Sequence, residues 1–168
     1  DKIAIYGASM GGYSAMMGVA RDPDFYAAGI SVVGVSDWIR QQKTMPTHWF
    51  ADIAYVTKYF GESGSPEDVE AMRQNSPLTL VDQVKAPVLI SHGERDPIVA
   101  VEQSRLFEAG LKRNNIEHEA VYYADEGHGY RKWQNKIDWY RRVEDFLAKH
   151  LGGRSGGFDY TEIGAKLF

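Results

Sequence analysis

The sequence predicts an α/β fold in which a mostly parallel sheet is flanked by helices. Short apolar runs recur along the chain, segments of helical periodicity separate them, and glycine or proline marks most of the boundaries. The chain has 168 residues, enough for one domain with a substantial core. Four runs are predicted as strands: residues 2–6, 27–35, 87–92 and 117–123.

Helices are expected between and after these strands. The first covers residues 14–20 and ends at Asp22-Pro23, because the residue before a proline avoids the helical conformation. Ser65 provides an N-cap and Pro66 a first helical position for a second helix. Two more segments each have one apolar face of helical period, residues 106–111 and 133–147. Residues 38–63 are aromatic without clear periodicity, and short helices joined by loops are predicted there.

Composition excludes several classes of function. The formal net charge is −4 without a basic block, so nucleic acid is not expected as a partner. No apolar run approaches the roughly 18 residues that a membrane span needs, so no membrane partner is expected either. The chain has no cysteine, which excludes disulfides, thiolate chemistry and cysteine-bound zinc. Composition does not assign a cellular compartment.

The segment YGASMGGY, residues 6–13, surrounds one serine with three glycines directly after the first strand. Residues 7–11 fit G-x-S-x-G, the nucleophile elbow, in which a serine stands on a sharp turn between a strand and a helix. Glycines two positions either side of Ser9 are expected to prevent side-chain clashes in this turn. The turn would present the Ser9 hydroxyl and direct the Met10 N–H toward a developing oxyanion. The pattern alone also fits a glycine-rich turn without catalytic function.

A serine hydroxyl needs a base, so a carboxylate and then a histidine should follow along the chain. His128, in DEGHGY, comes just after the fourth strand and lies between two glycines. It is therefore expected in a loop at the carboxyl end of a strand, where parallel sheets gather their functional groups. Structural or surface positions are expected for three other histidines: His48, His118 and His150.

The orienting carboxylate should follow the third strand, where SHGERDPIV offers Glu94 and Asp96. Asp96 is favoured, because Pro97 fixes a turn and the apolar residues after it dock that turn to the core. Glu94 is expected to be a solvated loop charge and remains the substitute candidate. An aspartate before a proline is also common in plain turns. The hypothesis therefore depends on three residue types that occur in the required order, each after a strand.

These residues predict a covalent mechanism. Asp96 would orient His128, and His128 would accept the Ser9 proton during attack and return it to the leaving group. Water would then hydrolyse an acyl-enzyme on Ser9. This chemistry requires no metal and no organic cofactor.

Several blocks of the sequence resemble the prolyl oligopeptidase family of serine peptidases, over about residues 1–150. GASMGGY is similar to the family's serine motif, NSPLTLVDQVKAPVLISHGERDPIV to the segment leading through its aspartate, and DEGHGY to its histidine loop. The resemblance implies an α/β-hydrolase fold, a peptide substrate and the site residues Ser9, Asp96 and His128. VVGVSDW followed by VTKYFG resembles the family's substrate pocket, which implies Val35 and Trp38 as pocket walls. Where the family often carries pocket tyrosines, this chain has Gln41.

The resemblance also implies that strands preceding the nucleophile strand are absent, so the α/β-hydrolase fold would be truncated at its amino-terminal side. Residues 1–150 would then be the carboxyl-terminal portion of a catalytic domain, and residues 151–168 a tail. An apolar strand with an open edge invites pairing. We therefore expect self-association or pairing with the missing amino-terminal part. Two alternatives to a serine peptidase remain: a carboxylesterase with the same triad, and a catalytically inert, self-associating fragment.

Overall fold

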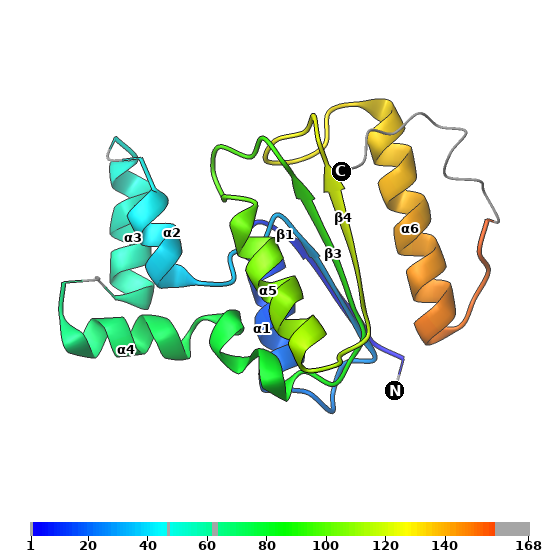
Figure 1. Cartoon of the computed structure of the whole chain (residues 1–168), viewed down its shortest axis with the longest axis horizontal. Helices are drawn as coiled ribbons and strands as arrows, with labels where there is room; N and C mark the ends of the chain where they lie inside the picture. Colours follow the sequence, from blue (N-terminus) through cyan, green and yellow to red (C-terminus); the bar gives the residue numbers. More distant parts are fainter. Residues whose placement is uncertain (1, 47, 62–63, 157–168) are drawn as a thin grey trace.

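The computed structural model describes residues 2–46, 48–61 and 64–156, and it shows the α/β architecture that the sequence predicts (Figure 1). Its sheet has four strands in the order β1-β2-β3-β4, and every neighbouring pair is parallel. The strands are β1 (Ala4–Ala8), β2 (Ala28–Val32), β3 (Val88–Gly93) and β4 (His118–Tyr123). The carboxyl ends of all four strands therefore lie at the same end of the sheet.

Helices cover both faces of the sheet. On one face, α1 (Met10–Arg21) and α5 (Glu102–Arg113) pack with the 3₁₀ helix η1 (Pro77–Gln83) in a cluster that includes Met16 and Phe107. On the other face, α6 (Trp133–Leu151) buries Trp139 and Phe146 against β2, β3 and β4. Figure 1 shows α1 and α5 on the opposite side of the sheet from α6. The sheet is therefore the middle of three layers.

Three further helices extend from one side of this sandwich: α2 (Trp38–Thr44), α3 (Phe50–Phe60) and α4 (Pro66–Gln74). They share an apolar cluster of their own, built around Trp38, Val56 and Met72. The Ser65 side chain accepts a hydrogen bond from the Asp68 N–H at 3.1 Å, so it is the N-cap that the sequence predicts. The aromatic region is more helical than its weak periodicity indicated.

Among the boundaries that differ from the sequence prediction, two have a clear structural reason. β2 ends at Val32 rather than at residue 35, because Val33 has a φ of 45°, which no extended strand can contain. The Val33 N–H instead donates to the Ser91 carbonyl at 2.8 Å. The first helix begins at Met10 rather than at residue 14, because Gly11 and Gly12 of the serine motif are already helical.

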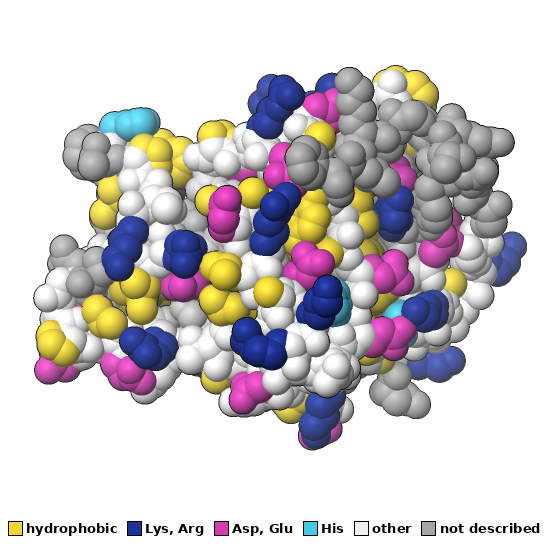
Figure 2. Space-filling view, viewed as in Figure 1, with side chains coloured by type: hydrophobic (Ala, Val, Ile, Leu, Met, Phe, Trp, Pro, Cys, Tyr) yellow, Lys and Arg dark blue, Asp and Glu magenta, His cyan; other side chains and the backbone are white. Residues whose placement is uncertain are grey.

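β1 is an edge strand of the described sheet. Among the described residues, β1 pairs with β2 alone, and the side chains of Tyr6 in β1 and of Ile3 just before it are about half exposed. α6 ends at Leu151 and is capped by Gly152, whose φ is 83°. Most of the predicted tail, residues 157–168, lies outside the described residues. Figure 2 shows acidic and basic side chains interspersed over the face in view. Within the described part of the chain, no helix has the length and apolarity to cross a bilayer.

Candidate active site

Ser9 stands on the turn between β1 and α1 in an unusual backbone conformation. Its φ is 56° and its ψ is −117°, a region that non-glycine residues rarely occupy. The turn is held in place because the Ser9 N–H donates to the Val32 carbonyl at 2.9 Å and the Ser9 carbonyl accepts from the Tyr13 N–H at 2.9 Å. The strain is thus maintained by the strand beside it and by the helix after it.

The glycines around Ser9 differ in whether a side chain would fit at their positions. A Cβ at Gly7 would lie 2.2 Å from the Gly11 carbonyl carbon, so only glycine fits there. A Cβ at Gly11 would meet no atom within 4 Å, which contradicts the expectation of a clash on both sides of the serine. The second close approach is at Gly12, where a Cβ would lie 2.7 Å from the Val32 carbonyl oxygen. The turn and its packing on β2 therefore require Gly7 and Gly12.

Met10 is the first residue of α1. The N–H groups of a first helical turn have no acceptor within the helix, and the helix dipole gives this end positive potential. The Met10 N–H immediately after Ser9 is thus available to a negatively charged oxygen.

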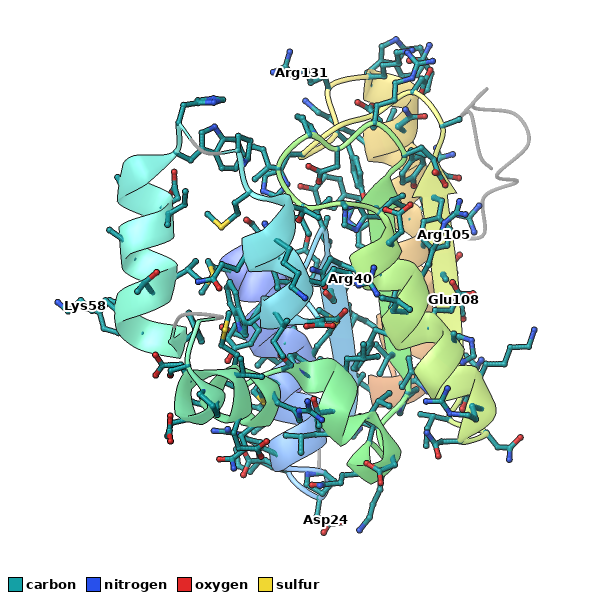
Figure 3. The ribbon with its side chains drawn as sticks, turned by 60° about the vertical axis from the view of Figure 1, so that its left-hand side comes forward. Asp24, Arg40, Lys58, Arg105, Glu108 and Arg131 are labelled. Atoms are coloured by element: carbon teal, nitrogen blue, oxygen red, sulfur yellow. The ribbon has the colours of Figure 1, made fainter. Side chains whose placement is uncertain are left out.

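The structure brings Ser9, His128 and Asp96 into one hydrogen-bonded line, although the sequence separates the first two by 119 positions. His128 Nε2 lies 2.8 Å from Ser9 Oγ, and His128 Nδ1 lies 2.7 Å from Asp96 Oδ2. Asp96 is in the loop after β3, and His128 is in the loop after β4. In Figure 3, Arg131, which follows the His128 loop, marks the end of the molecule where these loops lie, with Asp24 at the opposite end.

Both oxygens of the Asp96 carboxylate are saturated with donors. Oδ1 accepts the N–H groups of Ile98 and Val99 at 2.8 and 3.0 Å, while Oδ2 faces His128. Burial alone would raise the pKa of this carboxyl, but the hydrogen bonds from His128, from His92 and from the two backbone N–H groups outweigh it. The pKa of Asp96 is therefore held well below its ordinary value, and the group is a fixed carboxylate.

His92 is a neighbour of this carboxylate that sequence reasoning did not identify. It is fully buried in β3, and its Nε2 lies 2.8 Å from the Val99 carbonyl and 3.3 Å from Asp96 Oδ2. Because a carbonyl only accepts, Nε2 carries a proton that also faces the carboxylate. Nδ1 lies 2.7 Å from Ser104 Oγ. His92 thus ties the Asp96 turn to β3 and, through Ser104, to α5.

Glu126 anchors the loop that carries His128, and it was also missed. This side chain is only 3% exposed and accepts from the backbone N–H groups of Arg131 and Lys132, at 3.0 and 2.9 Å, and from Asn135 Nδ2 at 2.8 Å. The sequence DEGHGY places an acidic residue there, but its partners follow only from the folded loop. Glu126 holds both sides of the His128 loop against the start of α6.

A cavity of about 120 Å³ opens beside Ser9, between the loops and the α2–α3 pair. Val35 and Trp38, the expected pocket walls, both line it. Trp38 stacks on Phe60 with ring centroids 4.0 Å apart, and α2 is fixed at its start because Gln103 of α5 hydrogen-bonds the N–H groups of residues 36 and 37. Arg40 and Lys58 mark α2 and α3 in Figure 3.

The remaining sequence candidates lie elsewhere. Glu94, the substitute carboxylate, pairs with Arg105 of α5 and is only 15% exposed, so it is less solvated than expected. His118 lies in β4, where its Nδ1 is 2.8 Å from the Ile116 carbonyl, and His150 packs on Phe146 near the end of α6. His48 is exposed in the aromatic region.

Comparison with known proteins identifies relatives of the chain. The sequence model of the prolyl oligopeptidase family matches residues 1–154. The chain is 34% identical to dipeptidyl aminopeptidase BIII of Pseudoxanthomonas mexicana, over 96% of this chain and 24% of that protein. It is 33% identical to dipeptidyl peptidase family member 6 of Caenorhabditis elegans, over 94% of this chain and 22% of that protein.

Solved structures show the same likeness. The acylaminoacyl peptidase of Pyrococcus horikoshii superimposes with a TM-score of 0.79 at 26% identity, covering 96% of this chain and 26% of that one. The neighbours are α/β-hydrolase peptidases, so the parallel sheet is part of an α/β-hydrolase domain. The chain spans about a quarter of the length of the relatives that it matches.

Proposed function

Because the chain belongs to the prolyl oligopeptidase family, we propose that it carries the catalytic residues of a serine-type peptidase. In this proposal Ser9 is the nucleophile, His128 the general base and Asp96 the group that orients the histidine. The observation that carries it is the line from Ser9 Oγ through His128 to Asp96, with contacts of 2.8 and 2.7 Å. These are the distances that proton transfer from a nucleophile to a base requires.

The first step forms a bond between Ser9 Oγ and the carbonyl carbon of the scissile peptide. The serine proton moves to His128 Nε2, and the carbonyl π electrons move onto the oxygen. The Met10 N–H, at the positive end of α1, is placed to stabilise that oxyanion. Asp96 accepts the Nδ1–H of the imidazolium and stabilises its positive charge.

The second step breaks the C–N bond. The electron pair of this bond leaves with the amine, which takes its proton from His128 Nε2, and an acyl-enzyme remains on Ser9. Water then loses a proton to His128 as it attacks the ester, and Ser9 regains a proton as the carboxylic acid product departs. Each proton is supplied or taken by the same imidazole, so the cycle consumes only water and peptide.

The substrate pocket is the second part of the proposal. The cavity beside Ser9 lies where it can hold the side chain of the residue whose carbonyl is attacked, with Val35 and Trp38 as walls. A peptide is favoured as the substrate, since the relatives named above are called peptidases. The same triad would also hydrolyse carboxylic esters, because fold and triad do not determine the acyl substrate.

We also propose that the outer edge of β1 pairs with another strand, from the same protein or from a second copy. The half-exposed Ile3 and Tyr6 beside that edge support this, because an open apolar edge favours strand addition. Light scattering of the 168-residue chain should show association that increases with concentration. A monodisperse monomer at high concentration would contradict self-association and leave pairing within a longer protein as the remaining form of the proposal.

A substrate panel tests the proposed reaction. Peptide anilides with free and with blocked amino termini are compared with simple aryl esters, using the full chain and its Ser9→Ala variant. We expect anilide hydrolysis that the variant loses. Ester hydrolysis without anilide hydrolysis would support the carboxylesterase alternative. If neither class of substrate reacts, the isolated chain is inert, as the third alternative holds.

A further inference from the structure

We propose that Gln41 makes the cavity beside Ser9 selective for a substrate side chain that ends in hydrogen-bond donors, a lysine or arginine side chain above all. This inference rests on the proposed function, since it concerns the residue whose carbonyl Ser9 attacks. The argument comes from the orientation of one buried amide and from the composition of the walls around it.

The orientation of the Gln41 amide is determined by one hydrogen bond. Gln41 Nε2 donates to the Ile98 carbonyl oxygen at 2.9 Å. A carbonyl oxygen only accepts, so the amide cannot be flipped without placing two acceptors against each other. Gln41 Oε1 is therefore the atom that remains to be satisfied.

Gln41 Oε1 has no hydrogen-bond partner among the described residues. The side chain is 4% exposed and is part of the cavity lining, and its carbonyl oxygen is shielded from solvent. A ligand donor therefore reaches this oxygen only when it displaces the side chains that cover it. A buried polar atom without a partner costs free energy that a ligand donor can recover. An amide carbonyl offers two lone pairs and no proton, so the group that satisfies it must be a donor.

The other walls define the shape of that donor. Most of the lining is apolar, with Trp38, Val56 and Val99 among the buried residues, so it suits a hydrocarbon stem. Asp52 is the one carboxylate among the described lining residues. Lysine and arginine side chains combine an apolar stem with a positive end that carries donors and no acceptor. A norleucine or methionine side chain would fill the stem region and leave Gln41 Oε1 unsatisfied.

This selectivity depends on Gln41 itself rather than on the cavity's size. Gln42, the next residue of α2, donates to the Gly61 carbonyl at 3.3 Å and is not part of the cavity lining. The two glutamines therefore form a matched pair, because the same substitution removes an amide inside the cavity at one position and outside it at the other. Methionine is the suitable replacement, since it has a similar length and no donor or strong acceptor.

The experiment compares two irreversible inhibitors on the full chain. They are peptidyl diphenyl phosphonates that differ only in a lysine or a norleucine side chain at the phosphonate, each made with a free and with a blocked amino terminus. The measured quantity is the ratio of second-order labelling rates at Ser9, lysine over norleucine. Because the ratio is taken within one protein, a general loss of reactivity cancels. The proteins are the wild type, Gln41→Met, Gln42→Met and Asp52→Asn.

We expect the wild type to favour the lysine inhibitor roughly 10- to 100-fold, the range for a hydrogen bond that involves a charged group. Gln41→Met should bring the ratio close to one, Gln42→Met should preserve it, and Asp52→Asn should lower it partially. A wild-type ratio of one or below, or a preference that survives Gln41→Met, would overturn the inference. An alkyl fluorophosphonate tested in parallel distinguishes a failure of this inference from a failure of the proposed function. If Ser9 reacts with it and neither side chain is preferred, only this inference fails. If Ser9 reacts with no phosphorus probe, the proposed function fails as well.

Discussion

The two sides of Ser9 differ in how their polar atoms are satisfied. On the histidine side, the Asp96 carboxylate faces two backbone N–H groups and two imidazoles, and Glu126 accepts three hydrogen bonds. On the pocket side, Gln41 has one bond to a carbonyl and an oxygen without a partner among the described residues. On the histidine side the chain itself supplies the hydrogen-bond partners of these polar groups. On the pocket side a partner for the Gln41 oxygen is left for a ligand to supply.

This difference has a physical reason. Groups that stabilise charge during a reaction act best when they are already oriented, because no free energy is then spent on reorganisation. Groups that discriminate between substrates act best when they are satisfied by the correct substrate alone. We therefore expect variants on the histidine side to lower reactivity for every substrate. Variants on the pocket side should mainly change which substrate is preferred.

The largest effect is expected from Asp96→Asn, which keeps the shape of the side chain and removes its charge. The amide can no longer stabilise the imidazolium of His128, and it favours the wrong tautomer, so kcat should fall by about 10³–10⁴. The measurement is steady-state hydrolysis of the best substrate. Glu94→Gln is the matched control, because Glu94 pairs with Arg105 away from His128, and it should change kcat less than about threefold. Equal losses in the two variants would contradict the distinction between the two carboxylates.

The next effect concerns the turn that presents Ser9. Gly7→Ala places a Cβ 2.2 Å from backbone atoms of Gly11, and the required shift should lower the free energy of unfolding by about 1–3 kcal/mol or more. Gly11→Ala meets open space within α1 and should be neutral or stabilise the fold by about 0.5–1 kcal/mol. Urea unfolding of both variants measures the difference. A destabilisation by Gly11→Ala as large as that by Gly7→Ala would show that the close approach is not what the motif requires.

A smaller effect is expected from acid. The pKa of Asp96 is lowered in the folded state, so its hydrogen bonds stabilise the fold above the unfolded pKa of about 4, and this contribution is lost as pH falls further toward the folded value. Wild type and Asp96→Asn should therefore differ most in unfolding free energy near pH 6–7 and converge below about pH 4. Denaturant titrations at several pH values measure this. A difference that stays constant down to pH 2 would contradict a depressed pKa.

Sequence reasoning predicted the fold, and it selected three residues that the structure brings into hydrogen-bond contact, where local patterns were sufficient. Ser9, Asp96 and His128 could be selected because each follows an apolar run and each is flanked by glycine or proline, which mark turns. The end of β2 could not be predicted, because Val33 adopts a positive φ that is unfavourable for a β-branched residue and is imposed by its surroundings. Weak periodicity likewise concealed α3, whose apolar side chains face a cluster separate from the main core.

The supporting residues could not be predicted for a related reason. His92 acts through Val99 and Ser104, and Glu126 through Asn135, and these contacts exist only after the loops have folded. Gln41 could be recognised in the sequence as a departure from the usual pocket tyrosines. Its unpaired oxygen follows from the bond to Ile98, which lies 57 positions away in the chain. A buried polar group has to be assessed through its partners, and the sequence alone does not identify them.

The most direct test of the central claim is covalent labelling of the chain with a fluorophosphonate, followed by intact-mass measurement and peptide mapping, with His128→Ala as the control. The account predicts one adduct per chain, located on Ser9, and its loss in the control, because the serine reacts only when the imidazole accepts its proton. Labelling of Ser9 that persists in His128→Ala, or labelling at other residues while Ser9 remains unmodified, would contradict it.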